Sequence, residues 1–154
     1  MSESTTTPTD SPSEWVADHI RKYVASGGEE GYLWHGADGS FAPGAPILLL
    51  TTTGRKSGQA RRTALIFGQD GDDYLIVASK GGAPEHPLWY GNLVANPEVE
   101  LQVKADVFKA TARTATAEEK TRLWPKMVDV WPDYANYQTR TDRDIPIVIL
   151  TRAS

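Results

Sequence analysis

Residues 45–67, with the sequence APILLLTTTGRKSGQARRTALIF, decide the fold predicted for this chain. Two apolar stretches, 45–53 and 60–68, have the length and composition of β-strands. The six residues GRKSGQ between them carry glycine at 54 and 58, which is typical of a turn. Because so short a connection cannot make the crossover that joins parallel strands, the two strands are expected to form an antiparallel hairpin.

Four more stretches have the pattern of strands, separated by short turns or helices. The predicted strands are 74–80, 98–103, 107–115 and 144–152, and the predicted helices are 11–26, 87–96 and 116–131, with a short aromatic helix or loop at 132–142. Pro125 predicts a kink or an early end of the third helix. About six strands with three or four short helices indicate a mainly β, α+β fold, and tight strand connections favour a small antiparallel barrel over a βαβ sheet.

Length and composition indicate the class of protein. The 154 residues fit one domain over 14–154, preceded by a Thr-, Ser- and Pro-rich tail over 1–13 that is expected to be disordered. The sequence contains no cysteine, no signal-peptide pattern and no apolar run of bilayer-spanning length, so a cytoplasmic protein is expected. The formal charge of -4 argues against broad nucleic-acid binding.

The N-terminal helix is expected to be amphipathic, because Trp15, Val16, Ile20, Tyr23 and Val24 fall on one helical face. Packing on the barrel is the ordinary role of such a face. Two alternatives are closure over a pocket and a peripheral contact with a membrane surface. The sequence is compatible with a monomer or a homodimer.

Four cations gather at the predicted hairpin turn: Arg55, Lys56, Arg61 and Arg62. Residues 39–69 contain no Asp or Glu, so these cations have no acidic neighbour in the sequence. Guanidinium groups together with the backbone N–H groups of a glycine turn suit phosphate or carboxylate groups. Arg61 and Arg62 are adjacent on a strand and must face opposite sides, so at most one of them is expected to reach a given ligand. The alternative is a solvated basic hairpin.

Two further features are candidates for the walls of a ligand pocket. The segment ASKGGAPEHP, residues 78–87, leaves a strand through glycines and enters a helix, which can hold an anion or let a flat ring lie against backbone. Trp89 follows that segment, and Trp131, Tyr134 and Tyr137 are spaced three apart, so they can share one helical face. Core packing is the ordinary role of such aromatic residues. The alternative is a pocket for a flat ring, with phenol hydroxyls as hydrogen-bond donors.

Common catalytic motifs are absent from the sequence. It contains no GxGxxG, Walker A, HExxH or GxSxG motif. His19, His35 and His86 lack the spacing of metal ligands, so no metal site is expected. These absences favour a reaction in which a cofactor carries the chemistry while the protein binds and orients the reactants.

Four segments together resemble the deazaflavin-dependent nitroreductase family in order and spacing: LLTTTGRKSGQARRTALIF (49–67), VASKGGAPEHPLWYGNLVANPEVELQV (77–103), ATARTATAEEKTRLWP (110–125) and YANYQTRTDRDIPIVILT (134–151). The resemblance runs from about residue 23 to residue 152. Members of this family are actinobacterial-type split β-barrel oxidoreductases that use coenzyme F420. The resemblance implies a split β-barrel of the flavin- and deazaflavin-binding type. It also implies hydride transfer from reduced F420 to quinones, activated enones or lactones, or nitroaromatics.

The resemblance further implies roles for individual residues. The phosphate and glutamate tail of the cofactor would be held by Gly54, Arg55, Lys56, Ser57 and Arg61, and its ring would be lined by Ala78, Ser79, Lys80, Gly81, Gly82, Pro87, Leu88 and Trp89. The acceptor would face Ile66, Trp131, Tyr134 and Tyr137, with Tyr134 and Tyr137 as candidate proton donors and Ser79 as a polarising group. Ile66 and Trp131 stand where the best-known nitroreductases carry Tyr, and Leu88 replaces a Met, which weakens the expectation for nitroaromatics more than for cofactor binding.

Two other functions fit the same residues. A barrel that binds flavin mononucleotide (FMN) would need fewer cations, because FMN has a single phosphate. A non-enzymatic barrel that binds anions or nucleic acid would use the same basic turn, although the turn carries no aromatic residue for base stacking. The expected partners of the enzyme are coenzyme F420 and a small-molecule electron acceptor, and no nucleic-acid partner is expected. The expected location is the cytoplasm, with a membrane-associated location as the alternative.

Overall fold

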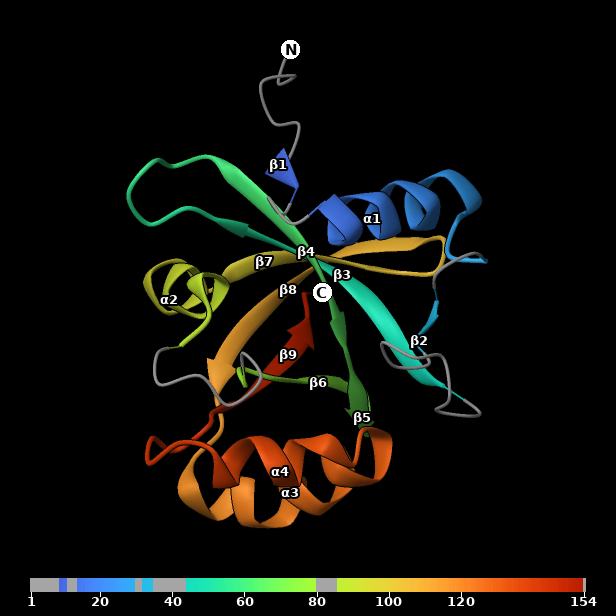
Figure 1. Ribbon diagram of the computed structural model, residues 1–154. Helices are drawn as coiled ribbons and strands as arrows, with labels where there is room; N and C mark the ends of the chain where they lie inside the picture. The colour runs from blue at the N-terminus through green and yellow to red at the C-terminus, as the bar shows by residue number, and fades with distance from the viewer. Residues whose placement is uncertain (1–8, 11–13, 30–31, 35–43, 80–85, 154) are drawn as a thin grey trace.

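The computed structural model describes residues 9–10, 14–29, 32–34, 44–79 and 86–153. The elements in chain order are β1 (Thr9–Asp10), α1 (Glu14–Ser26), β2 (Leu33–Trp34), β3 (Ala45–Thr53), β4 (Ala60–Ile66), β5 (Gly68–Asp70), β6 (Asp73–Val77), α2 (Leu88–Ala95), β7 (Glu98–Val103), β8 (Asp106–Thr114), α3 (Ala117–Val130), α4 (Asp133–Thr139) and β9 (Ile147–Arg152). Figure 1 shows a curled sheet in the middle of the molecule, with α1, α2 and the α3–α4 pair on three different sides of it.

The sheet has the antiparallel character that the sequence predicts. Hydrogen bonds join the strands in the order β1-β4-β3-β7-β8-β9-β6-β5, and β2 pairs with β3. Every pairing is antiparallel except that of β1 with β4. The three strands that the sequence does not predict, β1, β2 and β5, are two or three residues long. Strands this short leave no alternating pattern to detect.

The hairpin predicted from the sequence is formed by β3 and β4. Seven consecutive residue pairs join the two strands, ending with Thr53 and Ala60 beside the turn. The Gly54 N–H donates to the Gln59 carbonyl at 2.7 Å and closes the turn. Gly58 has a φ of +71°, a left-handed conformation that glycine adopts without steric cost. The turn therefore forms where the two glycines predict it.

The buried apolar side chains form three clusters. Two of them contain residues from opposite faces of β3, which is buried on both faces. Leu48 and Leu50 point into the barrel interior, whereas Ile47 and Leu49 point to the opposite face beneath α1. A third cluster, which includes Met127, lies between the sheet and the α3–α4 pair. The hairpin thus contributes to both the interior and the outer layer of the fold.

The helix α1 packs on the outer face of the sheet. Ile20 and Tyr23 are fully buried in the same cluster as residues of β3, which confirms packing on the barrel for these two side chains. Val24, predicted for the same face, is 41% exposed. The side chains of Trp15 and Val16 lie outside the described residues. None of the helices in the described part of the chain combines the length and hydropathy needed to span a bilayer.

The helix α3 differs from its prediction at Pro125. It runs from Ala117 to Val130, so the predicted early end is wrong. A proline inside a helix costs about 3 kcal/mol. However, Leu123 and Met127, which lie before and after the proline, are fully buried, and burial of each contributes about 1.5–3 kcal/mol. Packing on both sides of Pro125 therefore keeps the helix continuous.

The predicted disordered tail contains one short strand. Thr9 and Asp10 form β1, which pairs in parallel with Arg61 and Arg62 of β4. This pairing covers the outer edge of β4, whose backbone groups would otherwise need other partners. The rest of the predicted tail lies outside the described residues.

A buried hydroxyl joins α1 to two strands. The Tyr23 hydroxyl donates to the Ile47 carbonyl at 2.9 Å and accepts from the Lys104 N–H at 2.7 Å. Burial raises the pKa of Tyr23, so the hydroxyl stays protonated. Lys104 has a φ of +55°, a left-handed conformation that is unfavourable for residues with a Cβ. The hydroxyl therefore helps to hold the β7–β8 turn in an unfavourable conformation.

Tyr23→Phe is expected to lower the free energy of unfolding by about 1–3 kcal/mol, because the Lys104 N–H and the Ile47 carbonyl lose a buried partner. Urea denaturation measures this change. Tyr90→Phe is the control, since it removes an exposed hydroxyl contact with Thr114 and should cost about 0.5 kcal/mol or less. Equal losses in the two variants would contradict the role of Tyr23.

Candidate active site

A cavity of about 520 Å³ lies where β4, the end of β6, α2 and α4 meet. Its volume falls in the range of small-molecule sites, about 300–1,000 Å³. All three apolar clusters contribute to its walls, so its shape depends on the packing of the whole domain. The described residues that line it are His19, Trp34, Ile47, Thr63, Ala64, Leu65, Ile66, Val77, Ser79, Pro87, Trp89, Trp131, Tyr134 and Tyr137.

One wall of the cavity is aromatic. It is formed by residues of α4 and by Trp131, which directly follows α3. The Trp131 indole N–H donates to the Tyr137 hydroxyl at 3.3 Å, and the rings of Tyr134 and Tyr137 lie edge to face with centroids 6.0 Å apart. Burial, with a smaller contribution from Tyr137, raises the pKa of Tyr134, so this phenol stays protonated at neutral pH. Together with Ile66 of β4, the residues predicted to face the acceptor all line this one cavity.

The residues predicted to line the cofactor ring are only partly brought together. Ser79, Pro87 and Trp89 line the cavity, and Ser79 is only 8% exposed. Ala78 is buried but does not line the cavity, and Leu88 is 80% exposed on the outer side of α2. The remaining predicted residues, Lys80, Gly81 and Gly82, lie outside the described residues.

The cationic turn lies outside the cavity lining. Arg55, Lys56 and Arg61 are exposed, and Arg62 is half-buried, which agrees with the prediction that Arg61 and Arg62 face opposite sides. Ser57 is also part of this turn, and its hydroxyl accepts from the backbone N–H two residues later at 3.2 Å. The turn therefore presents a compact group of donors to solvent.

Arg55 lies against the helix α2. Its backbone N–H donates to the Asn92 side-chain oxygen at 3.1 Å, and the Asn92 amide is 3.3 Å from the Thr52 hydroxyl. A Cβ at Gly91 would lie 2.8 Å from Nη1 of Arg55. The Arg55 guanidinium thus occupies the space in which any other residue at position 91 would place its side chain.

The same helix connects the turn with the cavity. Trp89, in the first turn of α2, lines the cavity, whereas Gly91 and Asn92 contact Arg55. Trp89 and Asn92 are three residues apart and are therefore neighbours on the helix surface, whereas Gly91 is two residues from Trp89 and faces another side of the helix. The helix α2 therefore contributes to the lining of the cavity and also contacts the cationic turn.

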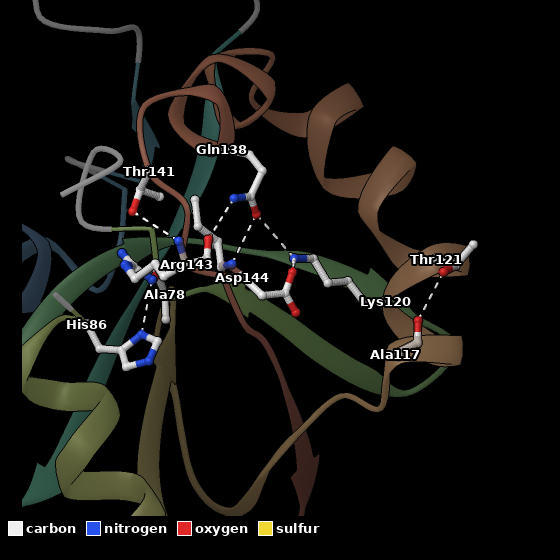
Figure 2. Close-up of polar contacts among 10 residues, drawn as sticks. Ala78, His86, Ala117, Lys120, Thr121, Gln138, Thr141, Arg143 and Asp144 are labelled. Carbon is white, nitrogen blue, oxygen red and sulfur yellow. Dashed lines mark hydrogen bonds and ion pairs between the residues drawn. The ribbon is translucent and has the colours of Figure 1, made fainter. Parts of the chain in front are cut away.

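A network of polar side chains contacts the backbone just after the end of β6 (Figure 2). Arg143 donates through Nη1 to the Ala78 carbonyl at 3.1 Å and through Nη2 to the Ser79 carbonyl at 2.7 Å. Nη1 also lies 3.0 Å from Nδ1 of His86. Since a guanidinium can only donate, the His86 ring must accept through Nδ1 and is neutral in this contact. Burial, together with the Arg143 cation, lowers the pKa of His86.

Several contributors to the site were not predicted from the sequence: His19, Trp34, Thr63, Gly91 and Asn92. His19 and Trp34 reach the cavity from α1 and β2 with their rings 6.3 Å apart, and no local pattern indicates such a distant approach. The role of Gly91 could have been suspected from the sequence, because it lies inside a predicted helix. Glycine inside a helix costs about 0.5–1 kcal/mol relative to alanine, so its presence suggests that another group needs the space.

Comparison with known proteins identifies the family. Residues 15–152 match the family model described as F420H(2)-dependent quinone reductase. The chain belongs to this family. The resemblance to F420-dependent reductases that the four sequence segments indicate is thereby confirmed.

Individual members of the quinone reductase family are closely similar to this chain. An F420H(2)-dependent quinone reductase of Mycobacterium tuberculosis (strain ATCC 25618 / H37Rv) is 49% identical over 122 residues, which are 77% of this chain and 82% of the relative. A solved F420-H2 dependent reductase (FDR-A) is 47% identical, with a TM-score of 0.64 over 68% of this chain and 93% of its own. A second structure, described as a domain-swapped dimer, is 40% identical, with a TM-score of 0.66 over 91% of this chain and 99% of its own. The predicted split β-barrel is confirmed.

The stability of this quinone reductase family member is expected to decrease at acid pH partly through His86. The folded protein holds the pKa of His86 below its ordinary value of 6.5, so the unfolded chain binds a proton first as the pH falls below 6.5. His86→Gln keeps a hydrogen-bond acceptor but cannot titrate, so it should reduce the loss of stability below pH 6.5. Thermal unfolding of both proteins across this pH range measures the difference. The same pH dependence in both proteins would show that His86 does not contribute.

Proposed function

We propose that the protein transfers a hydride from reduced coenzyme F420 to a quinone, with activated enones, lactones and nitroaromatics as further acceptors. The observation that carries this proposal is the position of α2, which contacts both an aromatic cavity, through Trp89, and an exposed cationic turn, through Asn92. Membership of the F420H(2)-dependent quinone reductase family supports it. The names of the relatives with 49% and 47% identity agree with the same activity.

The cationic turn has the donors that the anionic tail of F420 requires. Arg55, Lys56 and Arg61 are exposed, and the exposed Ser57 hydroxyl belongs to the same turn, whose shape is set by the hydrogen bond from the Gly54 N–H to the Gln59 carbonyl. A hydrogen bond to a charged group contributes about 1.5–3 kcal/mol, and exposure to solvent and salt lowers this value. Three such contacts together with burial of a ring are enough for micromolar affinity, which corresponds to about -8 kcal/mol.

The cavity has the dimensions and lining for the cofactor ring and a flat acceptor. Pro87 and Trp89, at the start of α2, and Ser79, just after the end of β6, line the cavity and would hold the ring. When bound, the reduced cofactor supplies a hydride, which is a two-electron donor. The apolar and aromatic walls exclude water, and they restrict the orientation of a flat molecule.

The aromatic wall would bind the acceptor and supply a proton, because reduction of a quinone to a quinol consumes one hydride and one proton. The Tyr137 hydroxyl accepts from the Trp131 indole N–H, which leaves its own proton available to an acceptor in the cavity. Tyr134, whose pKa is raised by burial, can donate a hydrogen bond without ionising. Ser79, which also lines the cavity, adds a further hydroxyl. Ile66 and Trp131 add no hydroxyl, so quinones are expected to be better acceptors than nitro compounds.

Turnover of reduced F420 with menadione, a cyclic enone and a nitroaromatic tests this proposal, together with titration of the purified protein with F420 and with FMN. We expect turnover with menadione to be fastest and F420 to bind more tightly than FMN. Tighter binding of FMN, or no turnover with any quinone, would contradict the proposal.

Lys56→Ala is expected to raise the Kd for F420 about tenfold and to change kcat by less than about twofold, because Lys56 would contact the tail and not the reacting ring. Cofactor titration and steady-state kinetics measure the two effects. Lys109→Ala on β8 is the matched control, since it removes an exposed lysine outside the proposed site and should leave the Kd unchanged. A normal Kd in the Lys56 variant would rule out the turn as the tail site.

A further inference from the structure

We infer that Arg143 is a positioning residue for the reaction: it fixes the chain after the end of β6 so that Ser79 keeps its place in the lining of the cavity. The inference rests on the proposed function. It adds to that proposal a residue that does not line the cavity, and it assigns the network of polar side chains after the end of β6 a part in catalysis.

The chain needs hydrogen-bond donors where β6 ends. Val77 is the last residue of the strand, and the next N–H, that of Ala78, donates to the Pro146 carbonyl at 2.9 Å. Ala78 is fully buried and Ser79 is 8% exposed, so a carbonyl without a partner here would be costly. Arg143 satisfies both carbonyls with one guanidinium, at 3.1 and 2.7 Å.

This contact also determines the path of the backbone. In a regular strand successive carbonyls point in opposite directions, so one guanidinium can reach both only where the chain turns. The planar guanidinium has donors at fixed angles, which a lysine ammonium does not reproduce. Arg143 therefore sets the direction in which Ser79 leaves the strand and faces the cavity.

Arg143 is itself held by α4, the helix that carries the cavity tyrosines. The Gln138 side-chain amide donates to the Arg143 carbonyl at 2.8 Å. The Gln138 side-chain oxygen accepts from the Ile145 N–H at 3.0 Å and from Lys120 Nζ at 3.3 Å. Gln138 directly follows Tyr137 in the sequence, and Figure 2 shows it above the loop that carries Arg143. The contacts thus connect Tyr137 with Ser79 through Gln138 and Arg143.

The consequence is a fixed relative position of two residues that line the cavity. Ser79 and Tyr137 both belong to the lining of the cavity in which the ring and the acceptor would lie. A displacement of about 1 Å of a positioning group can reduce the rate of a reaction up to about 100-fold. The cationic turn is held separately by α2, so a change at Arg143 should alter the rate more than the affinity for the cofactor.

Arg143→Lys tests the inference, because lysine keeps the charge but lacks the rigid planar group whose two nitrogens each bind one carbonyl. The matched control is Arg122→Lys, since Arg122 makes a two-donor contact with Asp70 at 3.1 and 3.1 Å and does not line the cavity. Gln138→Ala is a second variant, which keeps the guanidinium but releases the loop that carries it. All three are compared with the wild-type protein.

The first readout is kinetic, with reduced F420 and menadione. We expect Arg143→Lys to lower kcat about 10- to 100-fold while the Kd for F420 changes less than about threefold. Gln138→Ala should lower kcat by a smaller factor, and Arg122→Lys should behave like the wild type. A wild-type kcat in Arg143→Lys would overturn the inference. It would also be overturned if both arginine variants lost the same amount of kcat and of melting temperature, because the loss would then reflect stability alone.

The second readout needs no cofactor. Amide hydrogen exchange at Ala78, followed by NMR, should be faster in Arg143→Lys and unchanged in Arg122→Lys, because only the first change releases the end of β6. Unchanged exchange at Ala78 in the Arg143 variant would overturn the inference. Absence of turnover in the wild-type protein would contradict the proposed function, while the exchange measurement would still decide whether Arg143 fixes this segment.

Discussion

The antiparallel pairing of β3 with β4 is the interaction on which the rest of the structure depends. Its register sends Leu48 and Leu50 into the barrel and Ile47 and Leu49 towards α1, and a shift by one residue would exchange these faces. The same pairing places the cationic turn at one end of the hairpin and the cavity-lining part of β4 along its length. The register between β3 and β4 therefore determines both the packing of the fold and the position of the candidate site.

The parts of the fold and site that could be predicted are those encoded locally. The hairpin follows from two apolar strands and two glycines, and the aromatic wall follows from the spacing of Trp131, Tyr134 and Tyr137. The concentration of positive charge at the turn is likewise visible in the sequence, because residues 39–69 contain no acidic side chain. Each of these signals spans about 30 residues or fewer, and those of the hairpin and the aromatic wall depend on the backbone periodicity of one or two elements.

The parts that could not be predicted depend on contacts between distant segments. Arg143 and Ser79 are 64 residues apart in the sequence, and no local pattern assigns an arginine to two carbonyls in the segment that follows a distant strand. The contact of Arg55 with Gly91 is similar, since it requires both the turn and α2 to be placed first. Pro125 shows the opposite case: the local signal was clear, but the burial of neighbouring side chains outweighed it.

The central claim is that one ligand extends from the cavity to the cationic turn along α2. The most direct test compares the Kd of F420 with that of the same deazaflavin ring without its phosphate and glutamate tail, over a series of salt concentrations. The account predicts that the truncated ligand binds at least about tenfold more weakly at low salt, and that the difference shrinks as salt screens the charges. Equal affinities of the two ligands at every salt concentration would contradict it.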